Sequence, residues 1–478
     1  MAQLYFTDLS ALRARVMVDG ASVGLSEEEI SATNNLHLVD GMPFILGADG
    51  SYDHDLNRFF RACPTLGVHS LNSLRAYAHD ILIWLRFLSE RRGGKSAWTA
   101  DREDMVAFHE ARRLSPPPHR IAASSWNRAV AALDKFYRWA VEEKLIERAP
   151  FTYRQVWTRA QDGSVISVAA NMARERNARN GDMRFVSLDR YVLFRDVGLL
   201  GRLPDGREDP TWRGRNGERN ALFAELLVTT GLRLQEASHL LTVELPAPDR
   251  SEGQRSLPFR LAAAIAKGGK SREFRLPLRL LERLDDYAGV ERTIAVGRWR
   301  QHRAWKRIDA PIMALGHDRQ SLHFEHGHVR FDRLNPGERR RLLDDHSKEP
   351  LALWLTEGGL PMPMASWQAV FRRASMRCRS FGVDIEVTPH MLRHTFAVHM
   401  LTLLLREQIG WMLEERAGRM SPAYRRLIGD PLLKLQRLLG HSRIESTYIY
   451  LDHLDDAQAL VDSAVEQWGL DIASAKGA

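Results

Sequence analysis

Two blocks of helical periodicity, separated by a polar stretch rich in Arg and Asn, constrain the fold of this chain more than any other feature. At 478 residues the chain is also too long for one ordinary hydrophobic core, so two or three domains are expected. We predict an N-terminal extension at 1–60, a helical domain at 61–155, a linker at 156–182 and a second domain at 183–478. The extension has turn sequences but little periodicity.

The first domain is predicted to be a compact helical bundle. Apolar residues recur at three- and four-residue steps over residues 70–88 and again over 126–141. Between these stretches, residues 98–104 carry the sequence of a capped helix start, and the pattern closes before Pro150. These features are typical of a small all-helical domain.

The second domain is predicted to combine helices with a small β-sheet. Helices are expected at about 217–229 and 233–242, and a Lys-Gly-Gly-Lys sequence supplies the turn of a hairpin at 259–277. Beyond residue 350 the periodicity is helical to the end of the chain. The fold class expected for the whole chain is mainly α with a small β-sheet, an α+β fold.

The composition is basic, which favours a polyanionic partner such as nucleic acid. The formal net charge is +8 and the pI is about 9.6. Basic residues cluster at 298–307, where Trp299 and Trp305 are interleaved, and again at 339–341. Each cluster could contact phosphates or could be a solvated helix face, and the sequence leaves both alternatives open.

Membrane and secreted proteins are not expected. No uninterrupted apolar run approaches the length needed to span a bilayer, and the first residues lack the basic and apolar segments of a secretory signal. Cys63 and Cys378 lie far apart in the sequence and suggest neither a disulfide framework nor a zinc ribbon. We therefore expect a cytoplasmic protein with no membrane partner.

The step from His441 to Tyr450 pairs a possible phosphate ligand with a possible phenolic nucleophile. Residues 430–440 have the Asp-Pro start and the glycine end of one helix. Ser442 and Glu445 then form a capping-box pattern, which predicts a second helix that carries Tyr450. The histidine would lie at the junction, about two helical turns from the tyrosine.

A cationic helix start is predicted at 388–397, where a Thr-Pro sequence supplies the cap and the first position. His390, Arg393, His394 and Ala397 follow at spacings that place them on one face. At a helix N-terminus, where the macrodipole favours negative charge, such a face can bind an anion. A polar solvated face is the equal alternative.

Zinc binding is another possibility for this helix, because His390 and His394 are four residues apart. The metalloprotease pattern requires Glu directly after the first histidine, and Met391 stands there instead. His399 is expected to point away from the shared face. We therefore do not favour a zinc site.

Two further sets of residues are weak signals by themselves. Arg233 follows Gly231, which ends a helix, and Glu236 lies one turn on, where it could orient the arginine. Lys267 and Lys270 flank the glycines of the hairpin turn, where a lysine can reach a ligand while its backbone stays fixed.

Taken in order, these residues resemble the active-site set of the tyrosine recombinase (phage integrase) family: Arg233, Lys267, His390, Arg393, His441 and Tyr450. The resemblance covers the chain from about 185 to the end, and the segment 70–150 is similar to the family's helical core-binding domain. It implies that the two domains form a C-shaped clamp around double-stranded DNA. It also implies that four copies assemble on DNA, because strand exchange requires four active sites.

The resemblance implies that Tyr450 attacks the scissile phosphate, forms a 3′-phosphotyrosyl link and releases a 5′-hydroxyl. A tyrosine is a poor nucleophile at its free pKa of about 10, so it needs a base and a stabilised phosphorane. No metal ion or cofactor is required. The implied roles are general base for His390, phosphate ligands for Arg233, Arg393 and His441, and proton donor for Lys267. Glu236, His394 and Lys270 are expected to support them, with Lys270 as the alternative to Lys267.

The family spacing selects Tyr450 over Tyr448, which is expected to be a packing residue. The chain departs from compact family members by expected insertions near 290–350 and 402–430. An apolar stripe at 451–465 predicts a C-terminal helical tail that packs in its own domain or docks on a neighbouring protomer.

The expected function is that of a site-specific DNA recombinase or integrase of a mobile genetic element. A type IB topoisomerase shares the chemistry, but it would relax supercoils without a specific site. A catalytically silent DNA-binding protein would form no covalent adduct, and a zinc hydrolase would contain stoichiometric metal.

Overall fold

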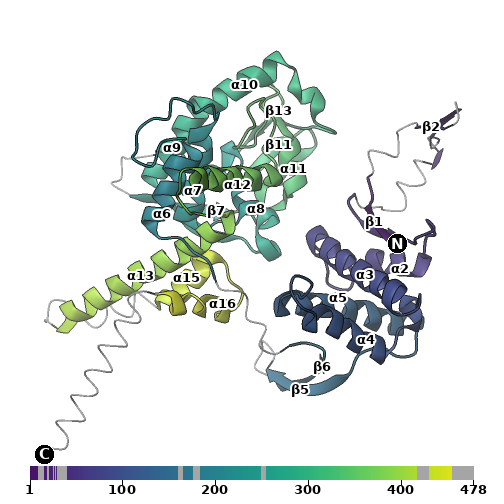
Figure 1. Cartoon of the computed structure of the whole chain (residues 1–478). Helices are drawn as coiled ribbons and strands as arrows, with labels where there is room; N and C mark the ends of the chain where they lie inside the picture. Colours follow the sequence, from purple (N-terminus) through teal and green to yellow (C-terminus); the bar gives the residue numbers. More distant parts are fainter. Residues whose placement is uncertain are drawn as a thin grey trace, which may run out of the picture. The chain divides into compact units, whose positions relative to one another are not determined.

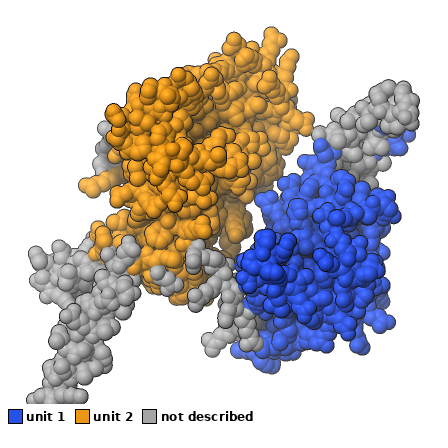
Figure 2. All heavy atoms as spheres, in the orientation of Figure 1, with its two compact units in different colours: residues 1–182 blue, residues 183–478 orange. Residues whose placement is uncertain are grey.

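The computed structural model describes residues 1–8, 16–18, 21–24, 26, 28–29, 40–159, 165–175, 183–248, 255–416 and 430–454. The chain forms two compact units, residues 1–182 and 183–478, which Figure 2 shows in different colours. Helices dominate both units and the strands form small sheets (Figure 1), so the predicted fold class is confirmed. The C-shaped clamp concerns the placement of one unit relative to the other and stays a prediction.

The first unit contains the predicted helical bundle. Helices α3 (Leu71–Arg91) and α5 (Ala123–Glu142) cover the two periodic stretches, which confirms both helix predictions. Helix α4 (Arg102–His109) begins at the predicted capped start, where Asp101 and Asp104 form a reciprocal capping box.

The first 60 residues contribute ordered elements to this bundle. Strand β1 (Gln3–Phe6) pairs antiparallel with β4 (Pro43–Leu46), and helix α2 (His54–Ala62) follows. Ile45 is buried, and its backbone N–H donates a 2.7 Å hydrogen bond to the side chain of Asn57 on α2. The prediction of an irregular extension is wrong for these elements, because their apolar side chains complete the core of the helical unit. Two more short strands, β2 (Val16–Val18) and β3 (Ala21–Val23), pair with each other.

The segment predicted as a linker contains an antiparallel hairpin of β5 (Tyr153–Arg159) and β6 (Val165–Asn171). Asp134 on α5 accepts hydrogen bonds from the hydroxyl of Tyr153 at 2.7 Å and from the side-chain amide of Asn171 at 2.8 Å. The linker prediction is wrong for these strands. Side-chain hydrogen bonds to a helix anchor this hairpin, whereas Trp157, Val165, Ile166 and Val168 stay exposed.

The second unit is built around an aromatic core in which Phe223 stacks on Trp367, with ring centroids 3.6 Å apart. Helix α7 (Gly217–Thr230) agrees with its prediction, whereas α8 (Leu234–Ser238) is shorter than predicted. Strands β7 (Ser256–Leu261) and β8 (Arg272–Pro277) pair as the predicted hairpin. Further elements are α6 (Leu188–Leu193), α9 (Leu278–Gly289), α10 (Glu291–Gln301), α11 (Pro336–Arg341), β9 (Ile312–Ala314), β10 (Gly316–His317), β11 (Ser321–Phe324), β12 (Gly327–Arg330) and β13 (Leu342–Asp344).

Residues 290–350, expected to be an insertion, fold onto this core. Arg339, from the second basic cluster, is buried and forms a 2.6 Å ion pair with Glu244. Both alternatives for this arginine are wrong, since it neither faces solvent nor is free to contact a phosphate. In the first cluster, Arg298 forms a 2.8 Å ion pair with Glu357. Whether the segment is an insertion relative to other proteins stays a prediction.

The remaining helices of the second unit are α12 (Met364–Ser380), α13 (Pro389–Arg416), α15 (Pro431–Leu439) and α16 (Glu445–Tyr448). Helix α15 packs beside α13 (Figure 1). Helix α13 continues without a break from Pro389 into the second expected insertion. Residues 417–429 of that insertion, and most of the predicted C-terminal tail, lie outside the described residues. Among the described helices, none is both long enough and apolar enough to cross a membrane.

Candidate active site

Two glycine-terminated helices bring the predicted site residues together. Gly231 ends α7 and Gly440 ends α15, each with a φ of +65° that an L-residue rarely adopts. A Cβ atom on Gly231 would lie 2.3 Å from the ring of Phe396 on α13, so the turn that carries Arg233 packs directly against the helix that carries the histidines. The predicted Thr-Pro start of α13 is present, and the backbone N–H of Met391 donates to the Thr388 hydroxyl at 3.3 Å.

Arg393 joins these elements from the centre of the site. Its side chain is buried and donates hydrogen bonds to the backbone carbonyls of Gly231 and Leu439, the second at 2.7 Å. Burial and the neighbouring Arg233 lower the pKa of Arg393 to about 9, which leaves it cationic at neutral pH. The arginine is therefore fixed between two segments that are more than 200 positions apart.

Glu236 orients Arg233, as the sequence predicts, and also binds an arginine that the sequence analysis missed. The buried carboxylate accepts hydrogen bonds from the backbone N–H and the guanidinium of Arg233, at 2.8 and 3.0 Å. Arg272 on β8 donates two more, at 2.9 and 2.6 Å. Burial acts to raise the pKa of Glu236, but the two arginines outweigh it and hold the pKa at about 2. The sequence does contain a hint of this burial. Arg272 lies two residues before Phe274 and four before Leu276, so all three face the same side of strand β8, and the two apolar residues are buried.

Three histidine rings and Tyr450 form a continuous row. The ring centroids of His390 and His394 are 4.4 Å apart, those of His394 and Tyr450 5.7 Å, and those of Tyr450 and His441 6.2 Å. Nδ1 of His394 lies 3.1 Å from the hydroxyl oxygen of Tyr450. Nδ1 of His441 lies 3.0 Å from the hydroxyl of Thr447, a second contact that the sequence analysis missed. The histidine that contacts the tyrosine hydroxyl is thus His394, which was expected only to support the site.

The two tyrosines differ sharply in environment. Tyr450 is 1% exposed, whereas Tyr448 is 47% exposed, so the prediction that Tyr448 is a packing residue is wrong. The predicted capping box does not form either: the cap position of α16 is Ile444, without a side-chain cap. Tyr450 lies just beyond the end of α16, where its backbone N–H donates to the carbonyl of Thr447 at 3.1 Å.

Burial and positive charge keep these histidines neutral at physiological pH. Burial, with the charges of His390 and Arg393, lowers the pKa of His394 to about 4. Burial, with Arg393 and Arg233, lowers the pKa of His441 to about 4, and the pKa of His390 is also lowered. Burial raises the pKa of Tyr450, while Arg393 and Arg233 partly oppose it. The site therefore presents a protonated phenol beside unprotonated imidazoles that can accept its proton.

Lys267 and Lys270 lie in the connection between β7 and β8, where a short 3₁₀ turn spans Lys267–Gly269. Both side chains are exposed. The charge of Lys267 contributes to the lowered pKa of His390, which places this lysine within electrostatic reach of the site.

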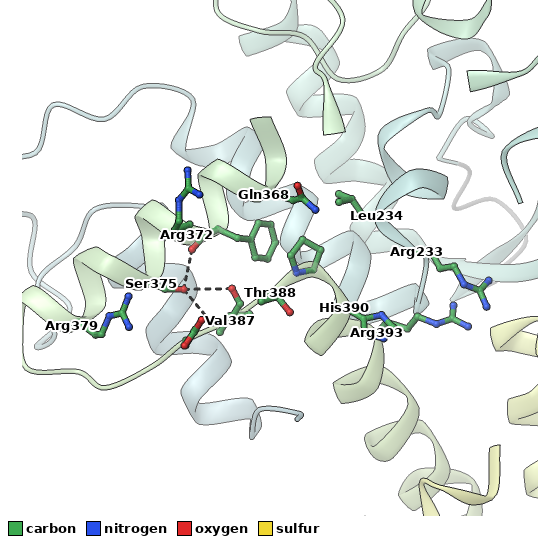
Figure 3. Close-up of a pocket in the computed structure, with 13 residues that line it drawn as sticks. Arg233, Leu234, Gln368, Arg372, Ser375, Arg379, Val387, Thr388, His390 and Arg393 are labelled. Carbon is green, nitrogen blue, oxygen red and sulfur yellow. Dashed lines mark hydrogen bonds between the residues drawn. The ribbon is translucent and has the colours of Figure 1, made fainter. Parts of the chain in front are cut away.

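A cavity of about 400 Å³ opens beside the cationic residues. Figure 3 shows Arg233, His390 and Arg393 gathered at one end of it, with Arg372 and Arg379 on α12 at the other. Ser375, at the same end as Arg372 and Arg379, donates to the backbone carbonyl of Phe371 at 2.9 Å. The arrangement gives an anionic ligand access to Arg233 and Arg393, which both line the cavity. In the part of the chain that the structure describes, no three His, Cys, Asp or Glu side chains are grouped so that they could hold a metal ion.

Comparisons with known proteins find related sequences over most of the chain. Residues 56–144 match the family model described as the phage integrase, N-terminal SAM-like domain. The chain is 24% identical to tyrosine recombinase XerC of Alcanivorax borkumensis over 407 residues, which cover 84% of this chain and 92% of the relative. It is 25% identical to tyrosine recombinase XerD of Agrobacterium fabrum over 425 residues, covering 87% and 94% of the two chains. Among solved structures, XerH recombinase bound to palindromic difH has a TM-score of 0.46 at 14% identity, covering 95% of this chain and 91% of that one.

Proposed function

We propose that this chain, which is similar to tyrosine recombinases over most of its length, cuts and rejoins DNA at a specific site with Tyr450 as nucleophile. One observation carries the proposal. The hydroxyl of Tyr450 contacts the unprotonated His394. The positive charges of Arg233 and Arg393 also act on Tyr450. A phenol, a proton acceptor and two cations are the parts that attack on a phosphodiester requires.

The proposed reaction is a transesterification. The phenolic oxygen of Tyr450 attacks the scissile phosphorus and forms a 3′-phosphotyrosyl bond, while the bond from phosphorus to the 5′-oxygen breaks. The phenolic proton passes to a histidine, and Lys267 supplies a proton to the departing 5′-oxygen. The incoming 5′-hydroxyl of a partner strand then reverses these steps and releases the tyrosine.

The cations stabilise the pentacoordinate phosphorane. Arg233 and Arg393 donate to its non-bridging oxygens, where negative charge accumulates, and His441 donates a further hydrogen bond. Because Glu236 and two backbone carbonyls already fix the arginines, little reorganisation is needed when the charge develops.

Two histidines are candidates for the proton acceptor. The family resemblance assigns this role to His390, whereas His394 is the one in contact with the Tyr450 hydroxyl in the DNA-free chain. We propose that His394 holds the hydroxyl before DNA binds and that His390 accepts the proton in the DNA complex.

The substrate is proposed to be double-stranded DNA, bound by a tetramer during strand exchange, in the service of a mobile genetic element. The basic composition supports a nucleic-acid partner. A type IB topoisomerase is the second candidate, since it would use the same phosphotyrosyl chemistry. Site-specific adducts and strand exchange favour the recombinase, whereas relaxation of supercoils at many positions favours the topoisomerase.

The decisive experiment is capture of the covalent intermediate. The full chain is incubated with nicked duplex oligonucleotides that tile the DNA flanking its own gene, and adducts are separated under denaturing conditions. The wild type and Tyr448→Phe should form an adduct at one sequence, and Tyr450→Phe should form none. An adduct that persists in Tyr450→Phe contradicts the assignment of the nucleophile.

A further inference from the structure

Arg272 uses every nitrogen of its guanidinium group inside the protein. Nη1 and Nη2 donate to the two carboxylate oxygens of Glu236, at 2.9 and 2.6 Å, and Nε donates to the backbone carbonyl of Leu438 at 3.0 Å. Its side chain is 8% exposed. Three of the five N–H donors of Arg272 are thus bound inside the protein, and the side chain is almost fully enclosed, so we look for its role in the elements that it connects.

One end of this connection is Arg233. Glu236 shares its carboxylate between Arg272 and Arg233, and the two arginines approach it from different elements, β8 and the start of α8. Without Arg272, the buried carboxylate would lose half of its charged partners and could follow Arg233 toward solvent.

The other end is the segment that carries His441. Leu438 lies in the last turn of α15, at the negative end of the helix dipole, where the final carbonyls cannot be satisfied by a further helical turn. Arg272 takes the carbonyl of Leu438, and Arg393 takes that of the next residue, Leu439. The fit is close, because a Cβ atom on Gly440 would lie 2.7 Å from Cδ of Arg272.

We infer that Arg272 is a positioning residue that ties Arg233, through Glu236, to the α15 end that presents His441, so that both face one phosphate. A lysine cannot replace it, because a single ammonium cannot span a planar carboxylate and reach a carbonyl on another element. The inference rests on the proposed function, since the phosphate is the group that both residues are proposed to bind.

The test compares Arg272→Gln and Arg272→Lys with the wild type on the nicked duplex identified by adduct capture. The matched control is Arg275→Gln, since Arg275 lies on the same strand, is exposed and bonds Ser256. Both Arg272 variants should cleave about 100-fold more slowly, with DNA affinity within about threefold of wild type, as expected when transition-state donors are displaced. Arg275→Gln should cleave at the wild-type rate.

A second substrate separates positioning from a general loss of structure. A methylphosphonate at the scissile position lacks one negative charge, so a misplaced Arg233 should matter less there. The defect of the Arg272 variants should therefore shrink about tenfold relative to wild type on this substrate. A folding defect would reduce both substrates equally.

The possible outcomes are distinct. Wild-type-like cleavage by folded Arg272 variants, or an equal loss on both substrates, overturns the inference and leaves the proposed function intact. Failure of Arg272→Lys to fold also overturns it, because Arg272 would then be needed for the fold itself. A wild type that forms no adduct with any duplex counts against the proposed function, and the inference fails with it.

Discussion

Nδ1 of His394 lies 3.1 Å from the hydroxyl of Tyr450. This contact connects the start of α13 to the segment that follows α16. His394 follows Arg393 directly, so one turn of α13 supplies both the arginine proposed to bind the phosphate and the histidine that contacts Tyr450. The site is therefore assembled around α13, and its other parts are arranged on that helix.

Substitution of His390 and of His394 should slow adduct formation to different extents. His390→Gln is expected to slow adduct formation about 10²–10³-fold, because a general base is typically worth that much. His394→Gln should slow it about tenfold or less, since it removes only the contact that holds the hydroxyl. Single-turnover cleavage of the nicked duplex measures both rates. If the order is reversed, His394 rather than His390 is the base.

The proposed role of Lys267 as proton donor can be tested by changing the leaving group. Lys267→Ala is expected to slow cleavage of an ordinary phosphodiester about 10²-fold or more, because the departing 5′-oxygen needs a proton. A substrate with sulfur at the 5′-bridging position releases a thiolate that needs no proton, so the defect should largely disappear. Lys270→Ala is the matched control from the same turn and should behave as wild type. If Lys270→Ala is the slow variant, and the 5′-sulfur substrate restores its rate, Lys270 rather than Lys267 is the proton donor.

Thermal stability should fall as the solution is acidified from pH 6.5 to pH 4. The pKa values of His394 and His441 are lowered from an ordinary 6.5 to about 4, so the unfolded chain binds protons in this range that the folded chain excludes. Glu236, with its pKa near 2, stays ionised throughout and adds stability that is lost only below the ordinary value of 4.5. The melting temperature of His441→Asn should depend less steeply on pH. His326→Asn, an exposed histidine of the same unit, is the control and should keep the wild-type slope.

Two glycines with similar left-handed backbone conformations should lose different amounts of unfolding free energy when each is replaced by alanine. Gly231→Ala and Gly268→Ala both force an L-residue into positive φ, which costs about 1–2 kcal/mol. At Gly231 the new methyl also meets the ring of Phe396, which adds about 1–3 kcal/mol, whereas nothing lies within 4 Å at Gly268. Denaturant unfolding of the two variants measures the difference. Equal losses would show that the contact between α7 and α13 adjusts freely.

The ends of the helices could be predicted because the groups that fix them are close in sequence. Asp430 accepts the backbone N–H of Leu432 at 2.7 Å, and Gly440 adopts the left-handed conformation that ends α15. The same holds for the start of α13. The order of the candidate site residues also lies in the sequence, and their convergence follows once these helices pack.

The tertiary structure decided which charges are buried and what they bind. Arg339 and Arg272 have neighbours that resemble those of surface arginines, yet each is enclosed by a carboxylate from a distant segment. The hairpin β5–β6 and the contact between His394 and Tyr450 likewise depend on partners far along the chain. A cap is satisfied within four residues and can be predicted from local sequence. The burial of a charge depends on whether a distant partner arrives to compensate its desolvation, and only the folded chain determines that.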